Sequence, residues 1–295
     1  KAVERRLSGP FGDELIAGPF IQRFSLFSLF FIPIFLNFKK KYIKYLLMFI
    51  LISLLLITLV LSGNRIPLIL YILSIIGIVI FEQRLRKFLL PFILITFVII
   101  FSATSLDENI RHHLNSFKQK TGQIFYIFSS ENLLTNEEEE KYKDFMFFTL
   151  EYKGKKYKLN NSHLKEFKTG YVTWLDKKFF GGGVKSFKIT CRKSSAADYC
   201  GSHPHNYYLE ILASLGLFGF LIFFILFSLI FMKTFVAKYF KKSNLNNYHL
   251  ITPFIFLFFA EIFPFKSTGS FFSTSNATFI FLMISIIIPL SKAKN

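Results

Sequence analysis

Seven long stretches without a charged side chain constrain this sequence more than any other feature. They are rich in Ile, Leu, Phe and Val and lie at residues 24–38, 45–64, 66–81, 88–106, 211–232, 243–260 and 267–291. A helix needs about 20 apolar residues to cross the hydrocarbon core of a bilayer. A soluble domain of 295 residues lacks the core volume to bury seven such helices. The sequence therefore predicts an all-α polytopic membrane protein with about seven transmembrane helices.

The positions of lysine and arginine predict how these helices are oriented, because cytoplasmic connections carry an excess of basic residues. Thirteen basic residues lie in four short segments that seven crossings would place on one side: 37–44, 82–87, 233–249 and 291–295. The short connections on the other side carry only Arg65 and Lys266. We therefore predict that the first set is cytoplasmic. The outer side would then hold residues 1–17, 62–65, 104–206 and 266–275.

One connection divides the chain, because it is far longer than the usual handful of residues between packed helices. About four predicted membrane helices occupy residues 1–103, the large outer loop spans 104–206, and about three more membrane helices lie in 207–295. The formal net charge of +18 raises nucleic-acid binding as an alternative. Cytoplasmic anchoring accounts for much of that charge, so this alternative is set aside. Because the chain starts at Lys1 with residues typical of a connection between helices, we expect an N-terminal truncation.

The outer loop has patterns that predict partial folding. Residues 144–160 resemble a β-hairpin with Gly154 in the turn. After Ser162, a plausible N-cap, residues 163–178 are predicted to form an amphipathic helix. Three glycines in 179–187 could place backbone N–H groups against a phosphate, but a plain turn is the favoured interpretation.

Cys191 and Cys200 are the only cysteines, and both lie on the outer loop. An oxidising compartment favours a disulfide between them. Two alternatives are a pair of free thiols and a metal site shared with His203 and His205. The spacing C-x8-C-x2-H-x-H matches no common zinc module, which weighs against the metal.

Three polar features near the predicted outer helix ends are candidates for chemistry. His203 and His205 flank a proline before a membrane helix that Asn206 can cap, and histidine is the usual proton acceptor near neutral pH. The alternative is that this turn only starts the helix and that its histidines are interfacial polar residues. Arg65 is suited to clamp an anionic headgroup, although it could simply anchor a helix at the interface. Glu261 is an ionisable group at helix depth, and such groups are usually functional or paired.

These segments and their order resemble the O-antigen ligase and polymerase family of bacterial membrane glycosyltransferases. The most specific likeness is HPHNYYLEILASLGLFGF from residue 203. Others are RLSGPF at 6–11, SGNR at 62–65, the helix and Gly-rich segment at 171–187, and STGSFFSTSNA at 267–277. The fold implied is GT-C-like, with the loop 104–206 on the periplasmic side of the bacterial inner membrane.

The resemblance implies transfer of a glycan from undecaprenyl diphosphate to an acceptor hydroxyl on the periplasmic face, without a metal or other cofactor. The acceptor is lipid A–core in the ligase and a second lipid-linked repeat in the polymerase. His205 matches the histidine that deprotonates the acceptor, and Arg65 matches an arginine that holds the diphosphate. A second arginine of the family falls at His163 here, so Arg192 or Arg6 could substitute for it. His203, Asn206 and Glu210 complete the expected substrate-binding set.

Two other classes of protein stay open at this point. A lipid-linked-sugar transporter would be expected to show internal repeats, broken helices at mid-membrane and a short outer loop. An assembly subunit would bind partners through its outer loop and would not need His205 or Arg65. The sequence alone does not separate ligase from polymerase.

Overall fold

The computed structural model is mostly helical and includes two short pairs of antiparallel strands. It describes residues 2–3, 6–7, 10, 16–35, 41–106, 108, 111, 115, 148–152, 155–159, 162–194, 200–240 and 248–291. The chain forms two compact units. One, which we call the helical unit, comprises residues 1–110, 223–266 and 274–295. The other, the loop unit, comprises residues 111–222 and 267–273.

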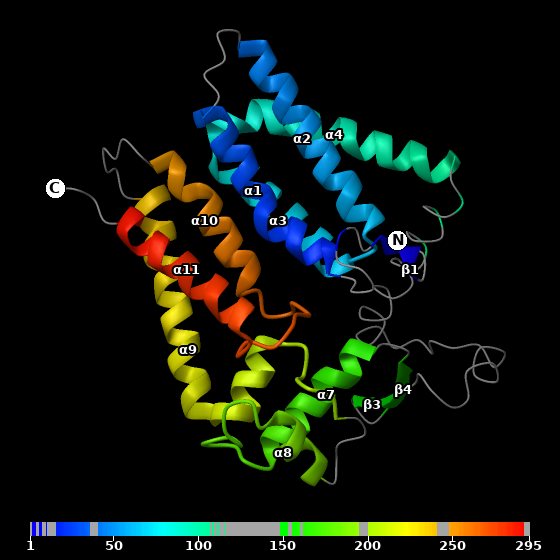
Figure 1. Cartoon of the computed structure of the whole chain (residues 1–295), viewed down its shortest axis with the longest axis vertical. Coiled ribbons are helices and arrows are strands. Elements are labelled where there is room, and N and C mark those ends of the chain that lie inside the picture. Colours follow the sequence, from blue (N-terminus) through cyan, green and yellow to red (C-terminus); the bar gives the residue numbers. More distant parts are fainter. Residues whose placement is uncertain are drawn as a thin grey trace. The chain divides into compact units, whose positions relative to one another are not determined.

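Apolar helices build the helical unit (Figure 1). They are α1 (Ala17–Phe35), α2 (Lys41–Leu61), α3 (Arg65–Phe81), α4 (Gln83–Leu106), the later part of α9 (Tyr207–Tyr239), α10 (Tyr248–Glu261) and α11 (Thr274–Ser291). Helix α10 packs against α1, α3 and α11, and from Ile251 it is buried along most of its length. Two strands, β1 (Ala2–Val3) and β2 (Arg6–Leu7), pair near the start of the chain.

Each of the seven predicted apolar runs coincides with one of these helices over most of its length. The last helix begins at Thr274 rather than at residue 267, because residues 267–273 turn and bond to the loop unit. Within the described residues, α9 and α11 are long and apolar enough to cross a membrane. Shorter apolar helices lie at 46–61, 65–81 and 251–261. The number of seven crossings therefore stays a prediction.

Glu82 joins helix ends at one end of the helical unit. Its carboxylate accepts hydrogen bonds from the Tyr239 hydroxyl at 2.9 Å and the Thr252 hydroxyl at 2.7 Å, and it pairs with Lys238 Nζ at 2.8 Å. Arg86 donates to the last carbonyls of α3, which otherwise lack a partner in the helix. These contacts bring the end of α3, the end of α9 and the start of α10 together, and the membrane side of the 82–87 and 233–249 connections stays a prediction.

A second ionic cluster, the Glu261 cluster, lies deep in the helical unit. Glu261 is 1% exposed and accepts hydrogen bonds from the Arg23 guanidinium and from Lys266 Nζ. Arg23 also donates to Asn276 Oδ1 at 2.7 Å and lies over the ring of Phe279. The cluster thereby connects α1, α10 and α11. The sequence predicted that Glu261 is either functional or paired with another charge. In the structure it forms ion pairs with Arg23 and Lys266.

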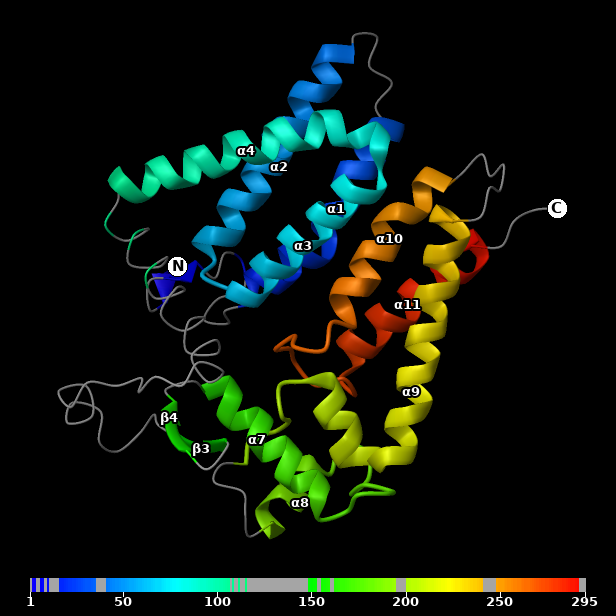
Figure 2. The same ribbon diagram turned by 180° about the vertical axis from the view of Figure 1, so that it is seen from behind.

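The loop unit contains a hairpin, two helices and the first part of α9 (Figure 2). Strands β3 (Phe148–Tyr152) and β4 (Lys155–Leu159) pair antiparallel, within the predicted hairpin; its turn residue Gly154 lies outside the described residues. Helix α7 (Ser162–Leu175) occupies most of the predicted 163–178 helix and is followed by α8 (Phe187–Lys193). The fold is therefore mostly, not entirely, helical.

Helix α9 is broken at Gly216, which has φ 69° and ψ −167°. The loop before α8 satisfies the backbone groups freed by this break. Gly182 and Gly183 donate to the carbonyls of Ala213 and Ser214, each at 2.8 Å, and the Leu217 N–H donates to the Lys178 carbonyl. A Cβ on Gly216 would lie 2.2 Å from the Phe179 carbonyl oxygen, so only glycine fits. The Gly-rich segment is thus a turn whose N–H groups bond to the chain itself.

Candidate functional site

The His-Pro-His-Asn segment at residues 203–206, which we call the histidine turn, leads directly into α9. Asn206 Oδ1 accepts hydrogen bonds from the N–H groups of Tyr208 at 3.0 Å and Leu209 at 3.1 Å, which makes it the N-cap. His205 has φ 52°, a left-handed backbone that costs a non-glycine residue about 1–2 kcal/mol. Such strain persists where surrounding contacts impose it, and it is concentrated at functional sites.

Helix α7 brings a carboxylate to this turn. A Cβ on Gly170 would lie 2.7 Å from Pro204 Cβ, so the absence of a side chain at Gly170 allows α7 to pack closely on the turn. One helical turn earlier, Glu166 Oε1 lies 3.5 Å from His205 Nε2. Sequence reasoning missed Glu166; its spacing of four residues from Gly170 was the available signal.

The two histidine rings lie against each other, with centroids 4.1 Å apart. His203 Nδ1 is 2.8 Å from the Ser202 hydroxyl. Burial, followed by the charge of the neighbouring His205, lowers the pKa of His203 below its ordinary value. His203 therefore stays neutral near pH 7, and the two rings do not both become charged there.

The segment 267–273 covers the same turn and is held by Glu210. The Thr268 N–H donates to the His205 carbonyl at 2.9 Å. The Glu210 carboxylate accepts hydrogen bonds from the Ser270 hydroxyl and the Phe271 N–H, and the Phe271 ring packs on Tyr207. Glu210 thus fixes the segment over the start of α9.

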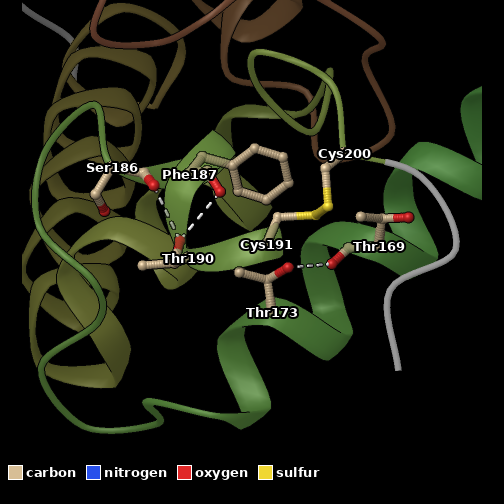
Figure 3. Close-up of a disulfide and its surroundings, with 7 residues drawn as sticks. All are labelled: Thr169, Thr173, Ser186, Phe187, Thr190, Cys191 and Cys200. Carbon is tan, nitrogen blue, oxygen red and sulfur yellow. Dashed lines mark hydrogen bonds between the residues drawn. A yellow bond between two sulfur atoms is a disulfide. The ribbon is translucent and has the colours of Figure 1, made fainter. Parts of the chain in front are cut away.

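Cys191 and Cys200 form a disulfide, with Cα atoms 5.7 Å apart (Figure 3). Cys191 is buried with Phe187 of α8 and Ala213 of α9, so the bond ties α8 and the start of the histidine turn to the same small core. Within the described part of the chain, no group of three His, Cys, Asp or Glu side chains could hold a metal ion.

Arg65 belongs to the helical unit, where it is the first residue of α3 and is half-buried. The turn before it is packed tightly on α1: a Cβ on Gly18 would lie 2.5 Å from Asn64 Cβ. Gly63 takes the left-handed conformation, with φ 65°. His205 belongs to the other unit, so the convergence of Arg65 and His205 stays a prediction.

The remaining predicted binding residues are distributed over several elements. His163 is near the start of α7 and Arg6 is in β2, but their side chains lie outside the described part. Arg192 is exposed in the last turn of α8. The structure therefore brings His203, His205, Asn206 and Glu210 together, and leaves the second cationic clamp as a prediction.

Comparison with known proteins adds the family. The family model described as O-antigen ligase matches residues 49–224, more than half of the chain and a range that includes both Arg65 and His205. No curated protein and no solved structure matches the chain. The family comprises integral membrane proteins with ligase- or polymerase-type glycosyltransferase activity on lipid-linked glycans. Because this model matches more than half of the chain, and the helical fold and the histidine turn are consistent with it, the chain belongs to the O-antigen ligase/polymerase family.

Proposed function

We propose that this protein is an O-antigen ligase that moves a glycan from undecaprenyl diphosphate to a hydroxyl of lipid A–core at the periplasmic face of the inner membrane. One observation carries the proposal: an imidazole held in a strained turn beside a carboxylate, His205 and Glu166, inside the segment that matches the family. The description of the matching family, O-antigen ligase, favours the ligase over the polymerase.

His205 is the proposed base. With Glu166 beside Nε2, the tautomer that carries its proton on Nε2 is favoured, which makes Nδ1 the basic nitrogen. Glu166 would also stabilise the imidazolium formed when His205 takes the acceptor proton. His203, neutral at pH 7, would pack against this ring without competing for the charge.

The proposed reaction is a single displacement at the anomeric carbon. The acceptor oxygen forms the new glycosidic bond, its proton passes to His205, and the bond to the diphosphate oxygen breaks. The diphosphate leaves with the electron pair, so it needs cationic stabilisation and no strong general acid.

Arg65 would supply that stabilisation. The guanidinium matches two phosphate oxygens at once, and the N-terminus of α3 adds the positive end of the helix dipole. We propose His163, Arg192 and Arg6 as candidates for the second clamp, and Asn206 and Glu210 as residues that position the turn.

The test is reconstitution of the purified protein in liposomes with a lipid-diphosphate glycan and two acceptors, lipid A–core and a second lipid-linked repeat. Product on lipid A–core supports the ligase. Product on the repeat alone would replace the ligase with the polymerase, and product with neither would contradict the proposed catalysis.

Arg65 offers a matched pair of variants for the same assay. We expect Arg65→Ala to lower turnover strongly and Arg65→Lys to recover only part of it, because lysine keeps the charge but not the planar two-point contact. Full turnover by Arg65→Ala would remove Arg65 from the proposed site.

A further inference from the structure

Three phenylalanine rings form an exposed cluster on the loop unit, at the break in α9. The ring centroid of Phe218 lies 6.3 Å from that of Phe179 and 5.3 Å from that of Phe180. The exposed fraction is 59% for Phe179, 79% for Phe180 and 53% for Phe218. We call Phe179, Phe180 and Phe218 the aromatic patch. An apolar patch of this kind usually marks a surface that contacts a partner or a membrane.

The backbone fixes the aromatic patch in place. The Phe218 N–H donates to the Phe179 carbonyl, and the adjacent Leu217 N–H donates to the Lys178 carbonyl at 2.8 Å. Gly181 is pressed against the α9 backbone, since a Cβ there would lie 2.4 Å from the Ser214 carbonyl carbon. The rings are therefore presented by a turn that is bonded to the helix, rather than by a loose loop.

Basic side chains surround the patch in sequence. Between residues 176 and 193 the acidic side chain is Asp176, whereas six lysines and arginines are all exposed: Lys177, Lys178, Lys185, Lys188, Arg192 and Lys193. Aromatic rings combined with lysine and arginine are typical of protein segments that lie in the headgroup layer, where the rings enter the acyl boundary and the cations meet anionic lipids.

The patch is also continuous with an apolar helix surface. Beyond Phe218, the same helix exposes Leu221 at 41% and Ile222 at 67% within the loop unit. Helix α9 is one of the two described helices that are long and apolar enough to cross a membrane. A lipid-facing surface that starts on this helix would therefore extend onto the aromatic patch.

We propose that the aromatic patch docks into the headgroup layer of an anionic phospholipid bilayer and holds the loop unit on the membrane surface. This proposal concerns a lipid surface and does not depend on the reaction assigned above. A second copy of the chain or an acidic protein are the competing occupants.

A depth measurement tests the proposal on the full chain in liposomes. Trp174 is the one tryptophan of the sequence, so Phe180→Trp in a Trp174→Phe background gives a single reporter on the patch. We expect lipids brominated near the headgroup end of the acyl chain to quench its fluorescence more strongly than lipids brominated near the chain end. If neither lipid quenches the fluorescence, the proposal is overturned. The same holds if crosslinking then shows that a protein covers the patch.

Paired charge variants separate lipid docking from general exposure to lipid. Removal of two lysines beside the patch, Lys177→Gln with Lys185→Gln, should lower the docked fraction relative to the undocked fraction by more than about tenfold in anionic liposomes, because each basic group contributes roughly fivefold. The matched control, Lys87→Gln with Lys233→Gln, removes the same charge from exposed lysines of the helical unit and should leave quenching unchanged. Equal effects from both pairs would overturn the proposal.

Folding of each variant is checked through the Cys191–Cys200 disulfide by peptide mapping without reductant. If the double tryptophan variant does not fold, Phe180→Cys labelled with a bimane fluorophore in the otherwise native chain gives the same depth measurement. The same outcomes support or overturn the proposal.

Discussion

The Glu261 cluster and the histidine turn place charged or titratable groups in opposite settings. Glu261 is 1% exposed, and its carboxylate is enclosed by Arg23 and Lys266. The His205 side chain is 35% exposed and has Glu166 beside it at 3.5 Å. A buried carboxylate between two cations connects helices, because removing the carboxylate leaves two buried charges without a counter-charge. A half-exposed imidazole can meet a substrate. We therefore expect the Glu261 cluster to stabilise the fold and the histidine turn to carry the proposed chemistry.

Replacing His205 should separate these roles most clearly. We expect His205→Gly to lower turnover by about 10²–10⁴-fold, the usual contribution of a general base. The free energy of unfolding should change by less than about 1 kcal/mol, because relief of the left-handed backbone offsets the entropy that glycine adds to the unfolded chain. Turnover per folded molecule and thermal unfolding in detergent measure the two effects.

His205→Asn is the matched control, since asparagine also tolerates the left-handed conformation but lacks the imidazole. It should lose activity as His205→Gly does. Full turnover by either variant would contradict the proposed role of His205 as the base.

Glu261→Gln should give the reverse result. Loss of the carboxylate leaves Arg23 and Lys266 buried without their counter-charge, which typically destabilises a protein by about 3–5 kcal/mol. Turnover per folded molecule should be unchanged. Unfolding and activity are measured as above on the same preparation.

A triple variant sharpens this prediction. Arg23→Met, Glu261→Met and Lys266→Met together remove all three charges and keep similar side-chain lengths, so much of the lost stability should return. A Glu261→Gln protein that stays stable but loses turnover would show that the Glu261 cluster serves the reaction rather than the stability of the fold.

The residues of the histidine turn were more predictable from the sequence than the contacts of the Glu261 cluster, and the reason is physical. Apolar runs located the helices, because burial in lipid requires uninterrupted apolar residues. His203, His205 and Asn206 were found because they are adjacent in the chain and lie at a helix start. Cys191 and Cys200 were found because they are the only cysteines.

Contacts between distant segments were not predictable in the same way. Arg23 is 238 residues from Glu261, and nothing in the pattern around Arg23 indicates its partner. Glu166 reaches His205 only because Gly170 allows α7 to approach Pro204. The sequence also gave no sign that the Gly-rich turn closes the break at Gly216, since that pairing joins backbone groups whose side chains carry no signal.

Glu166→Gln is expected to have an intermediate effect. The amide keeps the shape of the side chain but removes the charge that would stabilise the imidazolium of His205. A hydrogen bond to a charged group contributes about 1.5–3 kcal/mol, which corresponds to roughly 10–100-fold in kcat. KM for the lipid-linked donor should not change, because Glu166 acts through His205. Glu166→Asp should recover part of kcat, and an equal loss in kcat and in folded protein would contradict a positioning role.

The smallest effect should come from His203 and depends on pH. Because burial holds the pKa of His203 below its unfolded value of about 6.5, the unfolded chain binds more protons below that pH. The contribution of His203 to stability is therefore fully present above about pH 6.5 and is lost as the pH falls toward the folded pKa. His203→Gln should flatten this dependence in unfolding experiments across that range, whereas the Glu261→Gln variant should retain it. A pH dependence that survives His203→Gln would show that another group titrates, and the neutral ring beside His205 would need a different explanation.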